Sequence, residues 1–387
     1  MRDGKAGIGV IGCGMISGVY LENLTSHLSG VEVLACADLI HERAVAAAER
    51  FGIPKAVSNR ELIEDPDIDI VLNLTVPLAH AGINLEALEA GKHIYCEKPL
   101  AVTFEEAERI VALAAAKGLR VGGAPDTFLG AGLQTCRKLI DEGAIGRPTG
   151  FTANLICHGH ELWYPTPLVH YAKGGGPVLD VGPYYFTTLV ALLGPIRRIG
   201  GFARIHEPDR LVLGKPVDIE IPTSCSGILD FACGALGTVQ MTFDVWKSRL
   251  PRLEIHGTEG SLFLPDPNFF GGPLRLLRSR DVVARIDAET TLEGRRDWLY
   301  EASDTLVEEV PLAWPERTNM RGYGVTEMAA AIREGRPHRV SGELALHVVE
   351  ALTSFADSGT DGRIAEMRTP CGRPAPLPPG WPLWRDA

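Results

Sequence analysis

Several features that would indicate other classes of protein are missing from this sequence. No apolar run is long enough to span a bilayer, so a membrane protein is not expected. The formal net charge of -11 argues against a nucleic-acid partner, because such partners are bound by a basic face. The first residues run almost at once into an apolar stretch, without the layout of a secretory signal peptide. These absences favour a cytoplasmic protein that binds neither membrane nor nucleic acid.

Cysteine pairs with metal-binding spacing are also missing. The eight cysteines are scattered along the chain, and none are spaced as C-x-x-C. Cysteines distributed in this way in a cytoplasmic protein are expected to be reduced and mostly buried. A zinc site is therefore not expected.

The chain alternates between two kinds of pattern, which predicts two domains. Its 387 residues, 45% of them hydrophobic, are more than one ordinary core organises. Up to about residue 125, short apolar runs alternate with segments of helical length. This β-α-β-α alternation predicts a parallel sheet covered on both faces. The runs interpreted as strands are 5–12, 31–38, 68–76, 93–96 and 119–123.

After Gly146, strand-like runs follow one another directly, separated by turn signals. This predicts a mostly antiparallel open sheet, interrupted by helices near 183–193, 323–334 and 343–356. The expected fold class is therefore α/β plus α+β, with domains at 1–125 and 126–360. Residues 361–387 are rich in proline and are expected to form an extended strap over another surface.

A glycine-rich turn between the first strand and the first helix indicates a dinucleotide site. Residues 12–17 read G-x-G-x-x-S, where Gly12 permits the tight turn and Gly14 lets the backbone approach a pyrophosphate. Asp38 ends the second strand, where an acid hydrogen-bonds a ribose 2′-hydroxyl and repels a 2′-phosphate. The pattern predicts a Rossmann domain that binds NAD, with NADP less favoured. The cofactor contacts expected from this motif are Gly12, Gly14, Met15, Ile16 and Asp38.

Two further motifs give the chain a family resemblance. Glu97-Lys98-Pro99 follows a strand of the nucleotide domain, and the segment 174–182 reads GGG-x-x-x-D-x-G. Together with the G-x-G turn, they resemble the Gfo/Idh/MocA oxidoreductases over nearly the whole chain, from Ile8 to about Ala356. The resemblance implies that Lys98 touches the substrate hydroxyl near the nicotinamide, and that Asp180 is the acid of the second motif.

The chain departs from the family pattern at the proton-transfer position. The family has a histidine four residues after the acid, and this chain has Tyr184. Oxidising an alcohol requires a base near its oxygen, and free tyrosine, with a pKa of about 10, is a poor one at neutral pH. A nearby ammonium such as that of Lys98 should stabilise the phenolate and lower this pKa. The alternative is that Tyr184 only hydrogen-bonds the substrate and that the base lies elsewhere, for example at Lys98.

Other site residues follow from the resemblance and from the aromatic loop at 158–176. The resemblance places Asp126 and Thr127 beside the nicotinamide, and Thr75 and His80 in the loop on the adenosine side. The aromatic loop offers flat faces for a sugar ring, and its H-x-H pair suggests a metal only weakly. The expected additional cofactor contacts are Thr75, His80, Glu97, Lys98 and Asp126. The expected substrate contacts are Lys98, Thr127, Trp163, Tyr164, His170, Asp180 and Tyr184, and no metal ligand is expected.

The leading hypothesis is an NAD-dependent dehydrogenase of a sugar, inositol or glycoside, with Lys98, Asp180 and Tyr184 at the reacting carbinol. One alternative retains NAD and hydrolyses or eliminates a glycoside without net redox change. Another is a non-catalytic nucleotide-sensing regulator, against which the retained Lys98 and Asp180 argue. An uncovered face of the second sheet, with alternating apolar residues in 235–245, predicts a homodimer or homotetramer packed sheet to sheet.

Overall fold

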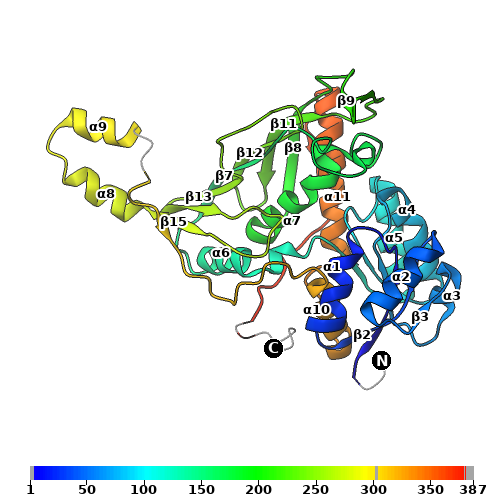
Figure 1. Cartoon of the computed structure of the whole chain (residues 1–387). Helices are drawn as coiled ribbons and strands as arrows, with labels where there is room; N and C mark the ends of the chain where they lie inside the picture. The colour runs from blue at the N-terminus through cyan, green and yellow to red at the C-terminus, as the bar shows by residue number, and fades with distance from the viewer. Residues whose placement is uncertain (1–3, 301–303, 379, 381–387) are drawn as a thin grey trace.

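The computed structural model describes residues 4–300, 304–378 and 380. Figure 1 shows two bodies built around separate sheets, with the long helix α11 running between them. Among the described residues, no helix combines the length and the apolar character needed to cross a membrane. The two sheets agree with the expected combination of α/β and α+β architecture.

The N-terminal body is a six-stranded sheet in the order β3-β2-β1-β4-β5-β6, and every neighbouring pair is parallel. Every residue of β1 and β4 is buried, as expected for strands with helices on both faces. The strands are β1 (Ala6–Ile11), β2 (Val31–Ala37), β3 (Lys55–Ala56), β4 (Ile70–Asn73), β5 (His93–Cys96) and β6 (Val121–Gly123). The helices are α1 (Ser17–Glu22), α2 (His41–Phe51), α3 (Asn59–Glu64), α4 (Pro77–Glu89) and α5 (Phe104–Lys117), and a π-helical turn at Asn23–His27 continues α1.

The C-terminal body is a nine-stranded sheet in the order β16-β15-β14-β13-β7-β12-β11-β8-β17. It is antiparallel except for the pair β7 and β12, so the prediction of a mostly antiparallel sheet is confirmed. The strands are β7 (Pro148–Ile156), β8 (Ile196–Arg204), β11 (Ser224–Phe231), β12 (Leu236–Thr242), β13 (Leu253–Gly257), β14 (Gly260–Leu264), β15 (Arg275–Arg278), β16 (Glu308–Glu309) and β17 (Ala365–Glu366). A separate hairpin pairs β9 (Leu211–Val212) with β10 (Lys215–Pro216).

Helices cover one face of this large sheet. All twelve residues of α7 (Gly182–Leu193) are buried, which is typical of a helix that is apolar all round and lies within a core. The helix α11 (Gly342–Asp361) is longer than expected, because Ser341 caps its start and Gly362, in a left-handed conformation, ends it. The remaining helices are α6 (Ala131–Asp141), α8 (Ser279–Asp287), α9 (Leu292–Tyr300) and α10 (Tyr323–Glu334).

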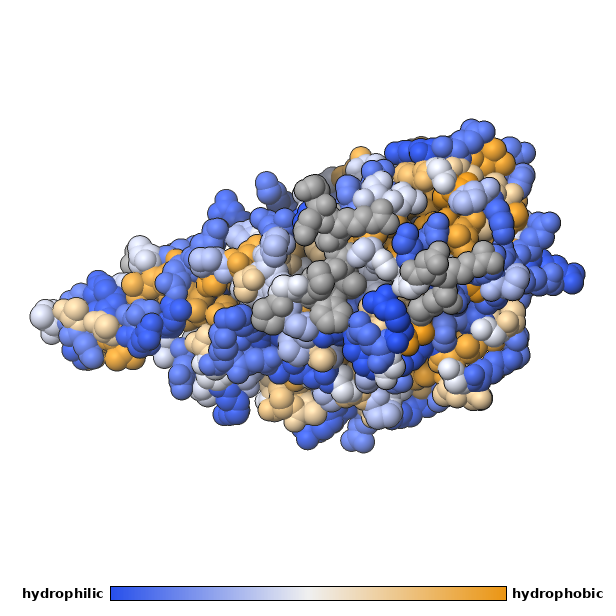
Figure 2. All heavy atoms as spheres, turned by 90° about the horizontal axis from the view of Figure 1, so that it is seen from below, coloured by the Kyte–Doolittle hydropathy of each residue, from blue (hydrophilic) through white to orange (hydrophobic). Residues whose placement is uncertain are grey.

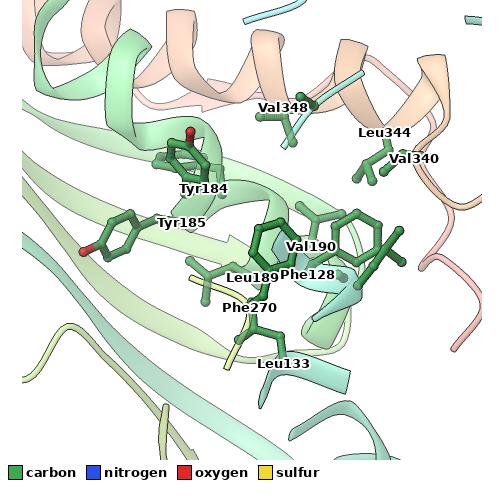
Figure 3. Close-up of a cluster of buried hydrophobic side chains, with 14 of the residues drawn as sticks. Phe128, Leu133, Tyr184, Tyr185, Leu189, Val190, Phe270, Val340, Leu344 and Val348 are labelled. Atoms are coloured by element: carbon green, nitrogen blue, oxygen red, sulfur yellow. The ribbon is translucent and has the colours of Figure 1, made fainter. Parts of the chain in front are cut away.

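The core joins the two bodies. Figure 3 shows Leu189 of α7 beside Phe128 and Phe270, which are buried apolar side chains from separate parts of the chain. The chain returns to the N-terminal sheet when Gly123 donates a backbone hydrogen bond to Val340, just before α11. The C-terminal segment is extended where it crosses α6, with the amide of Leu377 donating to Gln134.

The other face of the large sheet is open, and its composition corrects one expectation. The alternating apolar residues that were expected to lie on this face, Val239 and Met241, are buried on the helix-covered side instead. The open face carries other apolar side chains, since Phe202 is 68% exposed and Ile228 is 51% exposed. The face is therefore partly apolar, although for a different set of residues.

A helical arm extends from the edge of this sheet. It consists of α8 and α9, which lie between the paired strands β15 and β16 and contribute no buried residue. Figure 1 shows the arm projecting away from both bodies. Seen from below, it forms the narrow end of the molecule, on a surface where apolar patches interrupt a mostly hydrophilic face.

Candidate active site

The glycine-rich turn after β1 has the geometry of a phosphate cradle. Gly12 has a φ of +102°, and a Cβ there would lie 2.7 Å from the carbonyl carbon of Leu74, so only glycine fits. A Cβ on Gly14 would have nothing within 4 Å, so the space in front of the turn is open. Met15 is exposed beside it, and Ile16 precedes the first residue of α1. Backbone N–H groups at a helix N-terminus facing open space fit a dinucleotide pyrophosphate.

Asp38 lies beside this cradle. Its carboxylate accepts hydrogen bonds of 2.8 Å from the backbone N–H groups of Cys13 and Ile40. These bonds hold the acid at the end of β2, next to the glycine-rich turn. A ribose diol there would find an acceptor, whereas a 2′-phosphate would meet like charge.

The centre of the candidate site is an ion pair between the two bodies. Lys98, directly after β5, brings its Nζ to 2.7 Å from the Oδ1 of Asp180 and 2.6 Å from the backbone oxygen of the same residue. Burial alone would lower the pKa of Lys98, but the Asp180 carboxylate raises it above its usual range. Burial would likewise raise the pKa of Asp180, but the Lys98 ammonium holds it well below its usual range. Both groups are therefore charged at neutral pH.

Two histidines share the other oxygen of Asp180. The Nδ1 of His170 lies 3.0 Å from the Oδ2, and the Nε2 of His160 lies 3.6 Å from it. Burial lowers the pKa of His160 to about 4, which keeps this ring neutral. The Tyr164 ring packs edge-on against His170, with ring centroids 4.6 Å apart.

This group of side chains contains ligand types that bind metals, but its geometry differs from that of a metal centre. The rings of His160 and His170 stack with centroids 4.0 Å apart and planes 15° apart. Because imidazole lone pairs lie in the ring plane, two nearly parallel stacked rings cannot direct them at one ion. The H-x-H pair also separates, since His158 stacks on Trp246 instead. The arrangement is that of two imidazoles stacked beside one carboxylate.

Tyr184 lies next to the ion pair but does not behave as expected. The Lys98 ammonium is 5.5 Å from the centre of its ring, and the Nη2 of Arg321 is 3.5 Å from its hydroxyl. Burial raises the pKa of Tyr184, and this effect exceeds the lowering by Lys98 and Arg321. Lys98 does lower the pKa of the phenol, as expected, but burial raises it by more, so the net pKa lies above the usual value and not below it.

Arg321 is a site residue that the sequence did not reveal. It precedes α10 and is 137 positions from Tyr184, with no motif to connect the two. Only the packing of the loop before α10 against the N-terminal body brings them together. Tyr185, in contrast, points away from Tyr184 in Figure 3, and its hydroxyl donates to the backbone of Asn154.

Two residues expected beside the nicotinamide are buried between the bodies. The Asp126 carboxylate accepts hydrogen bonds from the amides of Gly322, at 3.1 Å, and Gly324, at 2.9 Å. Burial raises the pKa of Asp126 to about 6. Thr127, which follows in a short 3-10 helix, is also buried. The observed bonds of Asp126 indicate that it positions the start of α10.

Several residues that were expected to contact the cofactor instead make hydrogen bonds that hold the loops of the site. The two ring nitrogens of His80 lie 2.7 Å from the carbonyl oxygen of Pro99 and 3.0 Å from that of Thr75. Glu97 accepts hydrogen bonds from the Tyr20 hydroxyl, at 2.8 Å, and from the amide of Lys98. These bonds fix the loops that carry Thr75 and Lys98. Trp163 is 67% exposed at the outer rim, where it is free to pack against a ligand.

A parallel sheet with a phosphate cradle and an acid after β2, joined to a lysine–aspartate pair between two bodies, defines a dinucleotide-dependent oxidoreductase. Residues 6–123 match the model described as the oxidoreductase family with an NAD-binding Rossmann fold, and residues 133–263 match the GFO/IDH/MocA C-terminal domain. The chain belongs to the Gfo/Idh/MocA oxidoreductase family, and its cofactor is NAD.

The individual proteins that this chain resembles share only about a third of its residues or fewer over the aligned parts. The chain is 28% identical to inositol 2-dehydrogenase 3 of Saccharopolyspora erythraea over 283 residues, which cover 69% of this chain and 75% of that protein. It is 29% identical to levoglucosan dehydrogenase of Pseudarthrobacter phenanthrenivorans over 244 residues, covering 57% and 62%. The inositol 2-dehydrogenase of Salmonella typhimurium is 35% identical over 156 residues, and the match spans 44% of that protein.

Solved structures agree with this fold. An NAD-binding oxidoreductase from Klebsiella pneumoniae has a TM-score of 0.78 at 20% identity, with 95% of this chain and 100% of that chain covered. Levoglucosan dehydrogenase in complex with NADH and levoglucosan has a TM-score of 0.75 at 24% identity, covering 94% and 99%. At these identities the likeness establishes the fold.

We expect the chain to prefer NAD to NADP. We propose that Asp38 contacts the adenosine ribose, where its carboxylate would repel a 2′-phosphate, so affinity for NAD should exceed that for NADP by about tenfold or more, or about 1.4 kcal/mol. Titration calorimetry with the two cofactors measures this ratio, and Asp38→Ser should reduce it. Equal affinities for the unmodified chain would contradict this role of Asp38.

Proposed function

We propose that the protein transfers a hydride between NAD and a secondary alcohol of a sugar, inositol or glycoside. The observation that carries the proposal is the shielded ion pair of Lys98 and Asp180, which lies against Tyr184 where the two bodies meet. Only 16% and 19% of these two side chains are exposed. A charged pair in such a shielded position is costly to desolvate, which is typical of groups arranged for chemistry. The names of the relatives, which are polyol and anhydrosugar dehydrogenases, support a carbohydrate substrate.

Each side chain has a distinct part in this mechanism. Lys98 makes two hydrogen bonds to Asp180, which leaves its third N–H to donate to the carbinol oxygen. Asp180 keeps the ammonium charged and oriented, and it also orients His170. The phenol of Tyr184 exchanges the proton of the carbinol oxygen. NAD, when held by the glycine-rich turn and Asp38, supplies the hydride acceptor.

The polar and aromatic loop supplies the surface for the substrate. Tyr164 and His170 pack together beside Asp180, and Trp163 presents an exposed ring at the rim. Aromatic faces and imidazole rings that can hydrogen-bond suit an uncharged ring with several hydroxyls. A neutral polyol or glycoside is therefore the favoured substrate class.

All eight cysteines are free, which supports a reducing, cytoplasmic setting.

The reaction class can be tested with a panel of cyclic polyols, aldoses and glycosides in the presence of NAD. At least one compound should release NADH in proportion to its oxidation, as measured by the nicotinamide absorbance. Consumption of a glycoside without any accumulation of NADH would instead support the redox-neutral hydrolase or lyase. Binding of NAD with no turnover of any compound would leave the nucleotide-sensing regulator as the better description.

Replacing Tyr184 tests the proton-transfer step. Tyr184→Phe keeps the ring and removes the hydroxyl, so turnover should fall by roughly 10² to 10⁴ while NAD binding survives. Lys98→Met should be at least as damaging, because it removes both the contact and the charge. Asp180→Asn should weaken substrate placement as well as rate.

Tyr185→Phe is the matched control, because the hydroxyl of this neighbouring phenol donates to the backbone of Asn154. It should turn over at close to the unmodified rate. If Tyr184→Phe also retained most of the rate, the proton would go elsewhere. His170, which is held by Asp180, or Lys98 would then be the better candidate.

We further propose that the chain forms a homodimer or homotetramer through the open face of the large sheet. Phe202, Ile228 and Leu236 are exposed on this face, and a hollow of about 510 Å³ lies among Thr152, Gln240 and neighbouring residues. Exposed apolar side chains beside a hollow on an uncovered sheet face suit a second copy of the same surface. Light scattering at micromolar concentration should give a dimer or tetramer, and Phe202→Asp should shift it towards monomer. A monomer for the unmodified chain would contradict the proposal.

A further inference from the structure

Arg321 is held in the candidate site by bonds that cross between the two bodies. The side-chain amide of Asn23, at the end of α1, donates to the backbone oxygen of Arg321 at 2.8 Å and to that of Asn319 at 3.2 Å. The Asp126 carboxylate accepts from the two backbone amides that follow Arg321 at one and three residues. The backbone around Arg321 is therefore held by Asn23 of the N-terminal body and by Asp126, which lies between the two bodies.

Within the described part of the chain, the groups that accept hydrogen bonds from the Arg321 guanidinium are neutral. It donates to the Oδ1 of Asn268 at 2.8 Å, to the Oδ1 of Asn319 at 3.3 Å and to the hydroxyl of Tyr184 at 3.5 Å. Its guanidinium carbon also lies 5.9 Å from the centre of the Phe270 ring. Within residues 4–300, 304–378 and 380, no carboxylate lies within ion-pair distance of it. A partly buried guanidinium without an anionic partner is costly, so its position requires a compensating role.

Lys98 is in direct ion-pair contact with a carboxylate, whereas among the described residues Arg321 interacts with Glu97 and Asp126 only at longer range. Lys98 is paired with Asp180 at 2.7 Å. Its contact with Tyr184 is a cation–π contact, in which the Nζ lies over the face of the tyrosine ring. The charged groups that act on the phenol are Lys98 and Glu97 from the end of β5 and Arg321 from the loop before α10. Glu97 opposes ionisation of the phenol, and the two cations favour it. Of these groups, Arg321 is the one that hydrogen-bonds the phenolic oxygen.

We propose that Arg321 is the positioning residue that holds the Tyr184 hydroxyl at the reacting carbinol and stabilises its phenolate during proton transfer. This inference rests on the proposed function, in which Tyr184 exchanges the carbinol proton. In the oxidation, the oxygen–hydrogen bond of the carbinol breaks and its proton passes to the phenolate, which becomes a phenol again. The hydride passes from the carbinol carbon to the cofactor, and the electrons of the broken oxygen–hydrogen bond form the carbonyl. The phenol later releases its proton to water. The guanidinium remains protonated throughout and compensates the charge on the phenolate.

The test uses the full chain and compares two replacements of Arg321. Arg321→Gln keeps a hydrogen-bond donor and removes the charge, whereas Arg321→Lys keeps the charge and loses the planar fork. Tyrosinate absorbance is followed as a function of pH, with and without NAD, and the curve of Tyr184→Phe is subtracted to isolate this phenol. The pH dependence of kcat and of KM is measured on the substrate found in the compound panel.

Arg321→Gln should move the ionisation of Tyr184 upwards by about one pH unit. Because the reactive phenolate then becomes scarcer, kcat for oxidation should fall about tenfold below that pKa, with the alkaline limb of the profile displaced to match. For Arg321→Lys, both the ionisation of Tyr184 and kcat should lie between those of the unmodified protein and those of Arg321→Gln. Affinity for NAD should stay within about twofold of the unmodified value. Arg333→Gln, an exposed arginine on α10, controls for the loss of one positive charge and should change neither curve.

Two results would overturn the inference. One is an unchanged tyrosinate titration and pH profile in Arg321→Gln, with Tyr184→Phe still impaired, in which case the proposed function stands and Arg321 has no part in it. The other is a loss of NAD affinity as the main effect in both Arg321 variants, which would make Arg321 a cofactor contact. If Tyr184→Phe is itself fully active, the proton-transfer assignment fails before Arg321 is considered. If Arg321→Gln does not fold, Arg321→Lys supplies the same two curves.

Discussion

The ion pair between Lys98 and Asp180 is the interaction on which the arrangement of the site depends. It joins the carboxyl edge of the parallel sheet to the segment that enters α7, so it sets how the two bodies meet. Two mostly shielded charges are stable only when each compensates the other, and here each keeps its partner ionised. Breaking the pair would leave one uncompensated charge in a poorly solvated place. The same carboxylate also orients His170, so a single acid organises both the lysine and the aromatic loop.

The three glycines before Asp180 explain how the chain reaches this position. Gly174 and Gly176 have φ values of +89° and +80°, in the region that side chains disfavour. Gly175 has no room for a side chain, because a Cβ would lie 2.5 Å from the backbone oxygen of Val169. The loop must therefore fold tightly against its own earlier residues before it turns into α7. This path brings Asp180 to Lys98 and places Tyr184 one helical turn further on.

The parts of the structure that the sequence could predict are those with local causes. The turn at Gly12, the acid at Asp38 and the lysine after β5 each follow from what one short segment must do, so their motifs are visible in the sequence. The position of Arg321 depends on hydrogen bonds from Asn23 and Asp126, which are remote in the chain. The side of the large sheet that Val239 faces depends on where α7 and α11 pack. The raised pKa of Tyr184 depends on burial, which alternation and spacing do not report.

The replacement of the family's histidine by Tyr184 agrees with the charges around it. A histidine at this position would acquire positive charge on accepting the carbinol proton, between the Lys98 ammonium and the guanidinium of Arg321. Like charges so close in a poorly solvated site oppose that protonation. A tyrosine has the opposite requirement, since its reactive form is an anion that both cations stabilise. Burial destabilises that anion and raises the pKa of the phenol, and the two cations offset part of this increase. The arginine beside the Tyr184 hydroxyl and the tyrosine in place of the family's histidine are therefore electrostatically consistent with each other.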